Sequence, residues 1–263
     1  MEDIIKNNTG SKDELVAYLS AKAKKHKNYK HYTKLYKIET ILNNNTIYLS
    51  NGNNWNDIID KNNFNSDTND VVNFGVCLSY SKSENIAMWM LYSGNDGYMI
   101  DYDSKTIKDI LNTDTIEIGN FIDGVFVANK KFKSGLFDIS IFDIVYYDSS
   151  NYHDGMTENV YVKRSNEINK EFPKEKLDNL TFQKKTLPWS YENECRIVVS
   201  IKKALLQNVI GDTVAIPFSN KHIDELKKRI YASPNSRENN YKESCLKNKI
   251  NWDLCYGCKE RNK

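Results

Sequence analysis

The chain lacks the features of membrane, secreted and strongly charged proteins. No apolar run approaches the roughly 20 residues that span a bilayer, and the first residues, 1–6, lack the hydrophobic core of a signal peptide. The 37 basic and 35 acidic residues leave a net charge of +2, so no overall field favours nucleic acid, a membrane surface or an acidic partner. We therefore expect a cytoplasmic protein that does not bind membranes.

Proline and cysteine are also scarce. Four prolines and the absence of repeats leave few natural breaks between domains. Five cysteines, an odd number, fit reduced thiols better than a disulfide framework. Cys255 and Cys258 form one Cys-x-x-Cys pair, but no second pair completes a tetrahedral zinc site. We therefore expect no bound metal.

Residues that build a core are plentiful. Hydrophobic residues make up 40% of the 263-residue chain and aromatic residues 12%, which suffices for a packed interior. Short strand candidates interrupted by short helices predict a single α+β domain with mixed or antiparallel sheets and peripheral helices. Within it we distinguish an N-terminal helical extension (1–28), a core (29–200) and a C-terminal strand-and-helix annex (201–263). Capping-box spacing predicts helix starts at 11–14 and 81–84, and the highly charged segment 158–185 is predicted to be helical.

The most informative segment runs from Trp189 to Val199. Its apolar, β-branched end predicts a buried strand, and if that strand begins near Tyr191, then Glu192, Glu194 and Arg196 share one face. Charges at such a position need partners. Two interpretations remain open: Arg196 bridges a glutamate at an ion-paired strand entrance, or a carboxylate is held beside a substrate that becomes positive in the transition state.

Candidate ligand-binding residues also occur earlier in the chain. His31 lies on the first predicted strand beside Tyr32 and Thr33, where it is either a partly buried core residue or a hydrogen-bond partner for ribose or diphosphate. Trp89 and Tyr92 lie three residues apart, so one helical face presents both. That face is either part of the core or a stacking platform for a base or nicotinamide.

In their order and spacing, these segments resemble a widespread bacterial family of domains of unknown function. The resemblance covers roughly residues 29–200 and is carried by His31-Tyr32-Thr33, Trp55-Asn56-Asp57, Met88-Trp89-x-x-Tyr92 and Trp189-x-Tyr191-Glu192-x-Glu194-x-Arg196. The chain departs from the family pattern at Ile58, where proline is usual, and at Leu91, where histidine is usual. If that histidine is catalytic in the family, this chain works differently or not at all.

A more distant comparison suggests chemistry. An early histidine, a middle aromatic or hydroxyl residue and a late Glu-x-Glu pair are similar to the ADP-ribosyltransferase pattern, which implies a fold of that kind and NAD as co-substrate. The similarity implies that His31 binds the adenosine ribose and that the nicotinamide pocket is lined by Tyr48, Ser79 or Tyr92. It makes Glu194 the catalytic carboxylate, because a fixed negative charge stabilises the oxocarbenium character of the cleaved ribose. Glu192 would position the acceptor.

Three functions remain as alternatives. The first is an NAD-consuming transferase or glycohydrolase, such as a toxin or phage-defence effector, which binds a small nucleotide. The second is a non-catalytic sensor or interaction module of a defence system, in which the glutamates only tether Arg196. The third is a metal-dependent nuclease using Asp57, Glu192 and Glu194. No sequence feature points to a particular acceptor, protein partner or oligomeric state.

Overall fold

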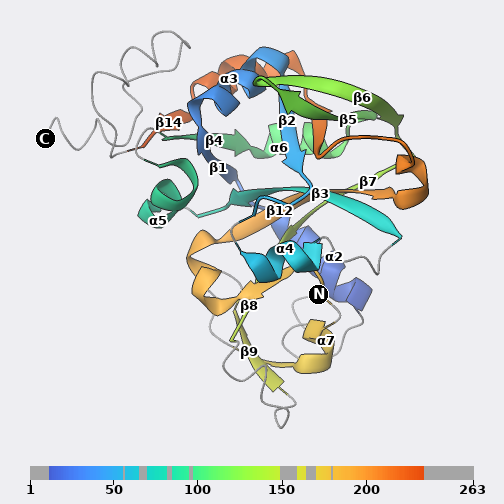
Figure 1. Cartoon of the computed structure of the whole chain (residues 1–263). Helices are drawn as coiled ribbons and strands as arrows, with labels where there is room; N and C mark the ends of the chain where they lie inside the picture. The colour runs from blue at the N-terminus through green and yellow to red at the C-terminus, as the bar shows by residue number, and fades with distance from the viewer. Residues whose placement is uncertain are drawn as a thin grey trace, which may run out of the picture.

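The computed structural model in Figure 1 describes residues 12–55, 57–64, 70–81, 85–94, 97–148, 159–163, 170–178 and 180–233. Asn56, the Cys255–Cys258 pair and part of each predicted capping box lie outside the described residues.

Short helices and many strands alternate along the chain. The helices are α2 (Lys12–Ala23), α3 (Leu35–Asn44), α4 (Ile58–Phe64), α5 (Ile86–Met88), the π-helix η1 (Trp89–Ser93), α6 (Ser104–Leu111), α7 (Lys174–Asp178), the 3-10 helices η2 (Leu187–Glu192), η3 (Lys203–Leu206) and η4 (Asn220–His222), and α8 (Ile223–Lys227). The strands are β1 (Asn28–Lys34), β2 (Thr46–Ser50), β3 (Val71–Ser79), β4 (Gly97–Asp103), β5 (Thr115–Ile122), β6 (Val125–Lys133), β7 (Asp138–Asp143), β8 (Val145–Tyr147), β9 (Asn159–Lys163), β10 (Lys170–Pro173), β11 (Lys184–Thr186), β12 (Glu194–Lys202), β13 (Thr213–Pro217) and β14 (Ile230–Ala232).

The main sheet has ten strands and branches at β3. One path runs β14-β4-β1-β3-β2-β13-β5-β6, and β12 pairs with β3 and with β7 beside it. Every pairing within this sheet is antiparallel, and β12 pairs with β3 over the full length of both strands. The branch brings β1, β2 and β12 together around β3, so segments far apart in sequence lie side by side (Figure 1). Side chains of these strands line one hollow.

Strand β12 is buried because it separates two cores. Cys195, Ile197 and Val199 point into the larger core, which lies under α3 and the strands paired around it, whereas Val198 points into a smaller core with α2 and β8. Side chains alternate across a strand, so the face that carries Val198 also carries Glu194 and Arg196. Two charged residues therefore lie on a strand with no exposed face.

Helix α3 shows how a local pattern positions one wall of this hollow. Ile38, Ile41 and Leu42 recur at helical spacing and are buried against the sheet. Asn45 ends the helix in the left-handed conformation at φ 49° and the chain turns directly into β2. The first turn of α3 is thereby fixed above the hollow.

The α+β prediction is confirmed, since the structure is a single domain with a mostly antiparallel sheet and short helices. The predicted helix over 158–185 is wrong: its described residues form β9, β10 and β11, with only the five-residue α7 helical. These strands build a second, four-stranded sheet with β8. Strand β9 pairs with β10 and with β8, and β11 pairs with β8, whereas the density of charge suggested a solvated helix.

The two terminal segments are joined to the core. From the segment called the annex, β13 pairs with β2 and β5, and β14 pairs with β4. At the other end of the described chain, α2 contributes Leu15, Tyr18 and Leu19 to the smaller core.

Candidate functional site

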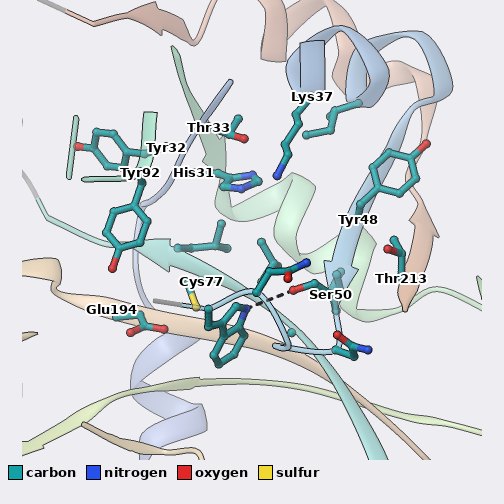
Figure 2. Close-up of a pocket in the computed structure, with 18 of the residues that line it drawn as sticks. His31, Tyr32, Thr33, Lys37, Tyr48, Ser50, Cys77, Tyr92, Glu194 and Thr213 are labelled. Carbon is teal, nitrogen blue, oxygen red and sulfur yellow. Dashed lines mark hydrogen bonds between the residues drawn. The ribbon is translucent and has the colours of Figure 1, made fainter. Parts of the chain in front are cut away.

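A pocket of about 650 Å³ opens between α3, β2, β3 and the segments around η1 and η2 (Figure 2). Its size lies within the range of about 300–1,000 Å³ that is usual for small-molecule sites. Seven of the sequence-predicted site residues line it, namely His31, Tyr32, Thr33, Tyr48, Tyr92, Glu192 and Glu194. The early histidine and both late glutamates therefore share one pocket.

Glu192 and Glu194 reach the pocket from two different elements. The predicted strand start near Tyr191 is wrong, because Glu192 ends the 3-10 helix η2 and β12 begins at Glu194. Between them Asn193 adopts the left-handed conformation at φ 45°, which asparagine tolerates better than most residues. The Ser79 hydroxyl donates to the Glu192 carbonyl oxygen at 2.6 Å and holds this turn on the end of β3.

Arg196 binds two of the acidic residues behind the pocket. Its guanidinium donates to both oxygens of Asp60, at 2.7 and 2.5 Å, and to the carboxylate of Glu194. The three side chains are at most 3% exposed. Bidentate pairing fixes direction as well as charge, so Asp60 on α4 and Glu194 on β12 are held in one arrangement. The guanidinium also lies 4.8 Å from the centre of the Trp55 ring.

Lys185 on β11 binds the same group of acids from the other side. Its Nζ lies 2.7 Å from Oε2 of Glu192, 3.1 Å from Oε2 of Glu194 and 3.7 Å from Oδ2 of Asp60. Its side chain is 4% exposed. The five residues that we call the acid cluster are Asp60, Lys185, Glu192, Glu194 and Arg196.

The acid cluster contains three carboxylates and two cations, so one negative charge is in excess when all five groups are ionised. Burial, followed by the charge of Glu194, raises the pKa of Glu192 to about 7. Burial also disfavours the charged form of Glu194, but Arg196 and Lys185 outweigh it and hold the pKa of Glu194 well below its ordinary value. Glu194 thus stays ionised, and Glu192 exchanges a proton near neutral pH.

Tyr92 holds the second oxygen of Glu192. Its hydroxyl donates to Oε1 of Glu192, while Lys185 holds Oε2. Burial, and then the charge of Glu192, raise the pKa of Tyr92, so the phenol stays protonated. The pocket therefore presents a carboxyl group whose orientation is fixed at both oxygens.

The opposite side of the pocket carries basic groups. Figure 2 shows Lys37 and His31 on the far side from Glu194, with Cys77 between. Burial, followed by the Lys37 charge, lowers the pKa of His31 to about 4, so its imidazole is neutral at physiological pH. Burial and then Lys34 lower the pKa of Lys37. The pocket is acidic on one side and basic on the other.

Aromatic side chains form the remaining walls. Tyr48 packs edge-on against Phe121, with ring centres 4.9 Å apart, and accepts a hydrogen bond from Asn44 at 2.9 Å. The Trp55 indole donates to the Ser50 hydroxyl at 3.2 Å, the dashed line in Figure 2. Such walls suit the flat rings of a base or nicotinamide.

Three predicted site residues do not line the pocket. Ser79 is fully buried and holds the η2 turn, and Arg196 lies behind Glu194. Trp89 is fully buried with its ring edge-on to Tyr32, at 4.9 Å between centres. Trp89 and Tyr92 both lie on the π-helix η1 and pack in one small cluster with Tyr32 and Met99. Trp89 belongs to the core, whereas Tyr92 also lines the pocket.

Sequence reasoning missed Asp60, Lys185 and Lys37. Asp60 lies on α4, in the segment between β2 and β3, where only the Trp55-Asn56-Asp57 motif carried a signal. Lys185 lies in the charged segment that was predicted to be helical, so the sequence did not indicate its position beside the glutamates. Lys37 lies in the first turn of α3, directly after the strand that carries His31. This closeness in sequence was the signal that could have identified it.

The acidic residues considered for a nuclease have other contacts. Asp57 accepts hydrogen bonds from the backbone amides of Ile59 and Asp60, at 2.9 and 3.2 Å, and so caps α4. Across the described part of the chain, no three or more His, Cys, Asp or Glu side chains are grouped to hold a metal ion. No helix among the described residues is long and apolar enough to cross a membrane.

Comparison with known families supports the resemblance drawn from the motifs. Residues 88–197 match the family described as "Protein of unknown function (DUF2971)". The DUF2971 match begins at Met88 and ends at Ile197, so it contains Trp89, Tyr92 and the whole Glu192–Arg196 segment. His31 and Trp55 lie before it. No curated protein and no solved structure matches the chain.

Proposed function

We propose that this protein binds NAD in the pocket and cleaves the bond between nicotinamide and ribose, transferring ADP-ribose to an acceptor or to water. The observation that carries the proposal is that Glu192 and Glu194 line the same pocket as His31, although 163 residues separate His31 from Glu194 in the sequence (194 − 31 = 163).

The charge distribution of the pocket suits this ligand. NAD has a positively charged nicotinamide ring at one end and a negatively charged diphosphate in its middle. The acid cluster provides an excess of negative charge on one side, and Lys37 provides positive charge on the other (Figure 2). Complementary charge fixes the direction in which a ligand binds, with nicotinamide toward Glu192 and Glu194.

The two glutamates have different parts in the reaction. When the carbon–nitrogen bond breaks, its electron pair leaves with neutral nicotinamide and the ribose carbon becomes positive. Glu194, held ionised by Arg196, stabilises that charge without moving. Glu192, whose pKa is raised to about 7 by burial and by Glu194, takes the proton of the attacking hydroxyl or water. The similarity to ADP-ribosyltransferases made Glu194 the catalytic carboxylate and had Glu192 position the acceptor. In the reaction proposed, Glu194 keeps its role and Glu192 is the base that takes a proton from the acceptor.

The test is nicotinamide release. We expect purified protein incubated with NAD, with and without a cell extract as acceptor source, to release nicotinamide. Glu192→Gln should lower the rate about a hundredfold or more, since it removes a preorganised group. Glu175→Gln, an exposed residue on α7, is the matched control and should leave the rate unchanged. Absence of release from wild type, or an unchanged rate in a folded Glu192→Gln, would falsify the proposal.

Depletion of NAD would also explain a toxin or phage-defence role. Expression of the wild-type chain in a bacterial host should then lower cellular NAD and arrest growth. Glu192→Gln expressed to the same level should do neither. Growth arrest by both proteins alike would show that toxicity does not depend on NAD cleavage.

Binding without turnover is the second candidate, and the acid cluster favours it. Glu194 contacts both Arg196 and Lys185, so its charge is largely compensated before any ligand arrives. A sensor built on this pocket should be stabilised by NAD in a melting experiment while nicotinamide release stays at background. That combination of results would mean that the protein is a nucleotide-binding module and not an enzyme.

A further inference from the structure

We infer that the N-terminal end of α3 is a subsite for a phosphate group, formed by Lys37 and the free backbone amides of the first helical turn. The inference shares the pocket of the proposed function and names the class of ligand that it selects, which is a phosphorylated nucleotide in preference to a nucleoside.

Lys37 is a cation at the pocket wall without a counter-charge. Within the part of the chain that the structure describes, its ammonium forms no ion pair, whereas Lys185 on the acidic side contacts three carboxylates. Lys34, its neighbour, donates to the backbone carbonyl of Ser93 at 2.7 Å. Lys37 is thus the pocket cation that remains available to a ligand.

The helix that carries Lys37, α3, begins without a side-chain cap from any residue that the structure describes. Its N-cap position, Lys34, makes no side-chain cap hydrogen bond, and its first turn contains no acidic residue. By contrast, α6 begins with Asp103, which accepts a hydrogen bond from the Thr106 amide at 2.7 Å. Uncapped amides and the helix dipole attract anions. Since Tyr36 and Lys37 both line the pocket, that end of α3 faces the ligand space.

His31 supplies an independent sign of a missing ligand atom. Its Nδ1 is buried and, among the described residues, has no hydrogen-bond partner. Buried polar atoms are nearly always paired, so each exception calls for an explanation. The imidazole lines the pocket next to Lys37 (Figure 2). Because Nδ1 has almost no exposed surface as the imidazole now lies, a ligand hydroxyl or phosphate oxygen beside Lys37 pairs with it once the ring turns toward the pocket.

The acid cluster explains why only one part of the pocket accepts a phosphate. Glu194 stays ionised, and above pH 7 Glu192 is ionised as well, so the acid cluster then has an excess negative charge that repels phosphate from that side. A nucleotide therefore binds with its phosphate at Lys37 and its sugar or base toward the carboxylates. A nucleoside has no such group and gains nothing from Lys37.

The test compares ADP, adenosine and inorganic pyrophosphate by calorimetry at low and moderate salt. We expect wild type to bind ADP at least about tenfold more tightly than adenosine, with an advantage that declines as salt rises. Pyrophosphate, which has no base, should compete with ADP. Lys37→Met should remove the advantage of ADP and leave the affinity for adenosine unchanged. Lys105→Met, an exposed lysine on α6 that does not line the pocket, should behave as wild type.

Several results would overturn the subsite. These are the absence of ADP binding, equal affinity of wild type for ADP and adenosine, or equal loss of both in Lys37→Met, which would indicate damage to the pocket as a whole. Because the readout is binding, it separates from the proposed function: ADP selectivity without nicotinamide release retains the subsite and rejects the enzyme. Nicotinamide release by a wild-type protein that binds ADP no more tightly than adenosine rejects the subsite alone.

Discussion

Asp60 and Arg196, 136 residues apart in the chain, form a two-point ion pair beneath the pocket, with donor–acceptor distances of 2.7 and 2.5 Å. This pair ties α4, in the segment between β2 and β3, to the central strand β12. It also orients the guanidinium that holds Glu194 and lies against Trp55. One buried arginine thereby positions an acidic group and an aromatic wall of the same pocket.

Replacing Arg196 by methionine should destabilise the protein strongly. The change leaves Asp60 and Glu194 buried without their main cation, and breaking a buried ion pair in this way costs about 3–5 kcal/mol. Urea unfolding of the two proteins measures the difference. The control is Lys131→Met, which breaks a surface pair with Glu117 at 3.6 Å and should cost less than about 1 kcal/mol. An equal loss of unfolding free energy in both variants would mean that the buried ion pair contributes no more to stability than the surface pair.

Glu192 should make stability depend on pH. Burial and the charge of Glu194 raise the pKa of Glu192 from 4.5 to about 7, so between these values the folded state binds more protons than the unfolded state. The free energy of unfolding should therefore fall as pH rises from 4.5 to 7, by about 3 kcal/mol at most. Residue 192 cannot ionise in Glu192→Gln. The free energy of unfolding of this variant should therefore rise relative to that of wild type over this interval.

Denaturant unfolding at pH 5 and pH 8 checks this pH dependence. Glu175→Gln serves as the control and should follow the wild-type curve at both values. A constant difference between Glu192→Gln and wild type from pH 5 to pH 8 would show that Glu192 is already ionised throughout.

Gly75 on β3 is a position where any side chain collides with the buried ring of Phe64. A Cβ atom there would lie 2.8 Å from Cζ of Phe64 and 3.4 Å from the Trp55 ring. Gly75→Ala should lower the free energy of unfolding by about 1–3 kcal/mol through overpacking. Phe64→Leu in the same chain makes room, so the double variant should be more stable than the sum of the two single effects predicts. Simple additivity in urea unfolding would argue against the contact.

His31 should remain neutral far below the ordinary range of histidine. Burial and the nearby Lys37 charge lower its pKa from 6.5 to about 4. An NMR titration should therefore show that the His31 imidazole stays uncharged at pH 5. His31→Gln should remove that signal, whereas His222→Gln should not. Titration of the His31 signal near pH 6.5 would mean that the ring is open to solvent.

The fold class was predictable because strand alternation and helical spacing are local. The run from Glu194 to Lys202 forms a buried strand as expected, with Glu194 and Arg196 on one face. The helix over Leu35–Asn44 also agrees with its spacing of apolar residues. The charged segment around Lys185 was predicted wrongly, because its strands β9 and β11 pair with β8, which lies outside the segment.

From the order and spacing of the motifs, we predicted that His31, Tyr92 and the two glutamates form one site. In the structure these residues line one pocket. Their catalytic roles stay predictions. The residues that set the charge of the pocket, Asp60 and Lys185, had no local signal. Ion pairing and desolvation depend on which side chains tertiary packing brings within a few ångströms. Backbone geometry over a few residues decides a strand or a helix, whereas only the assembled sheet decides which carboxyl group keeps its proton.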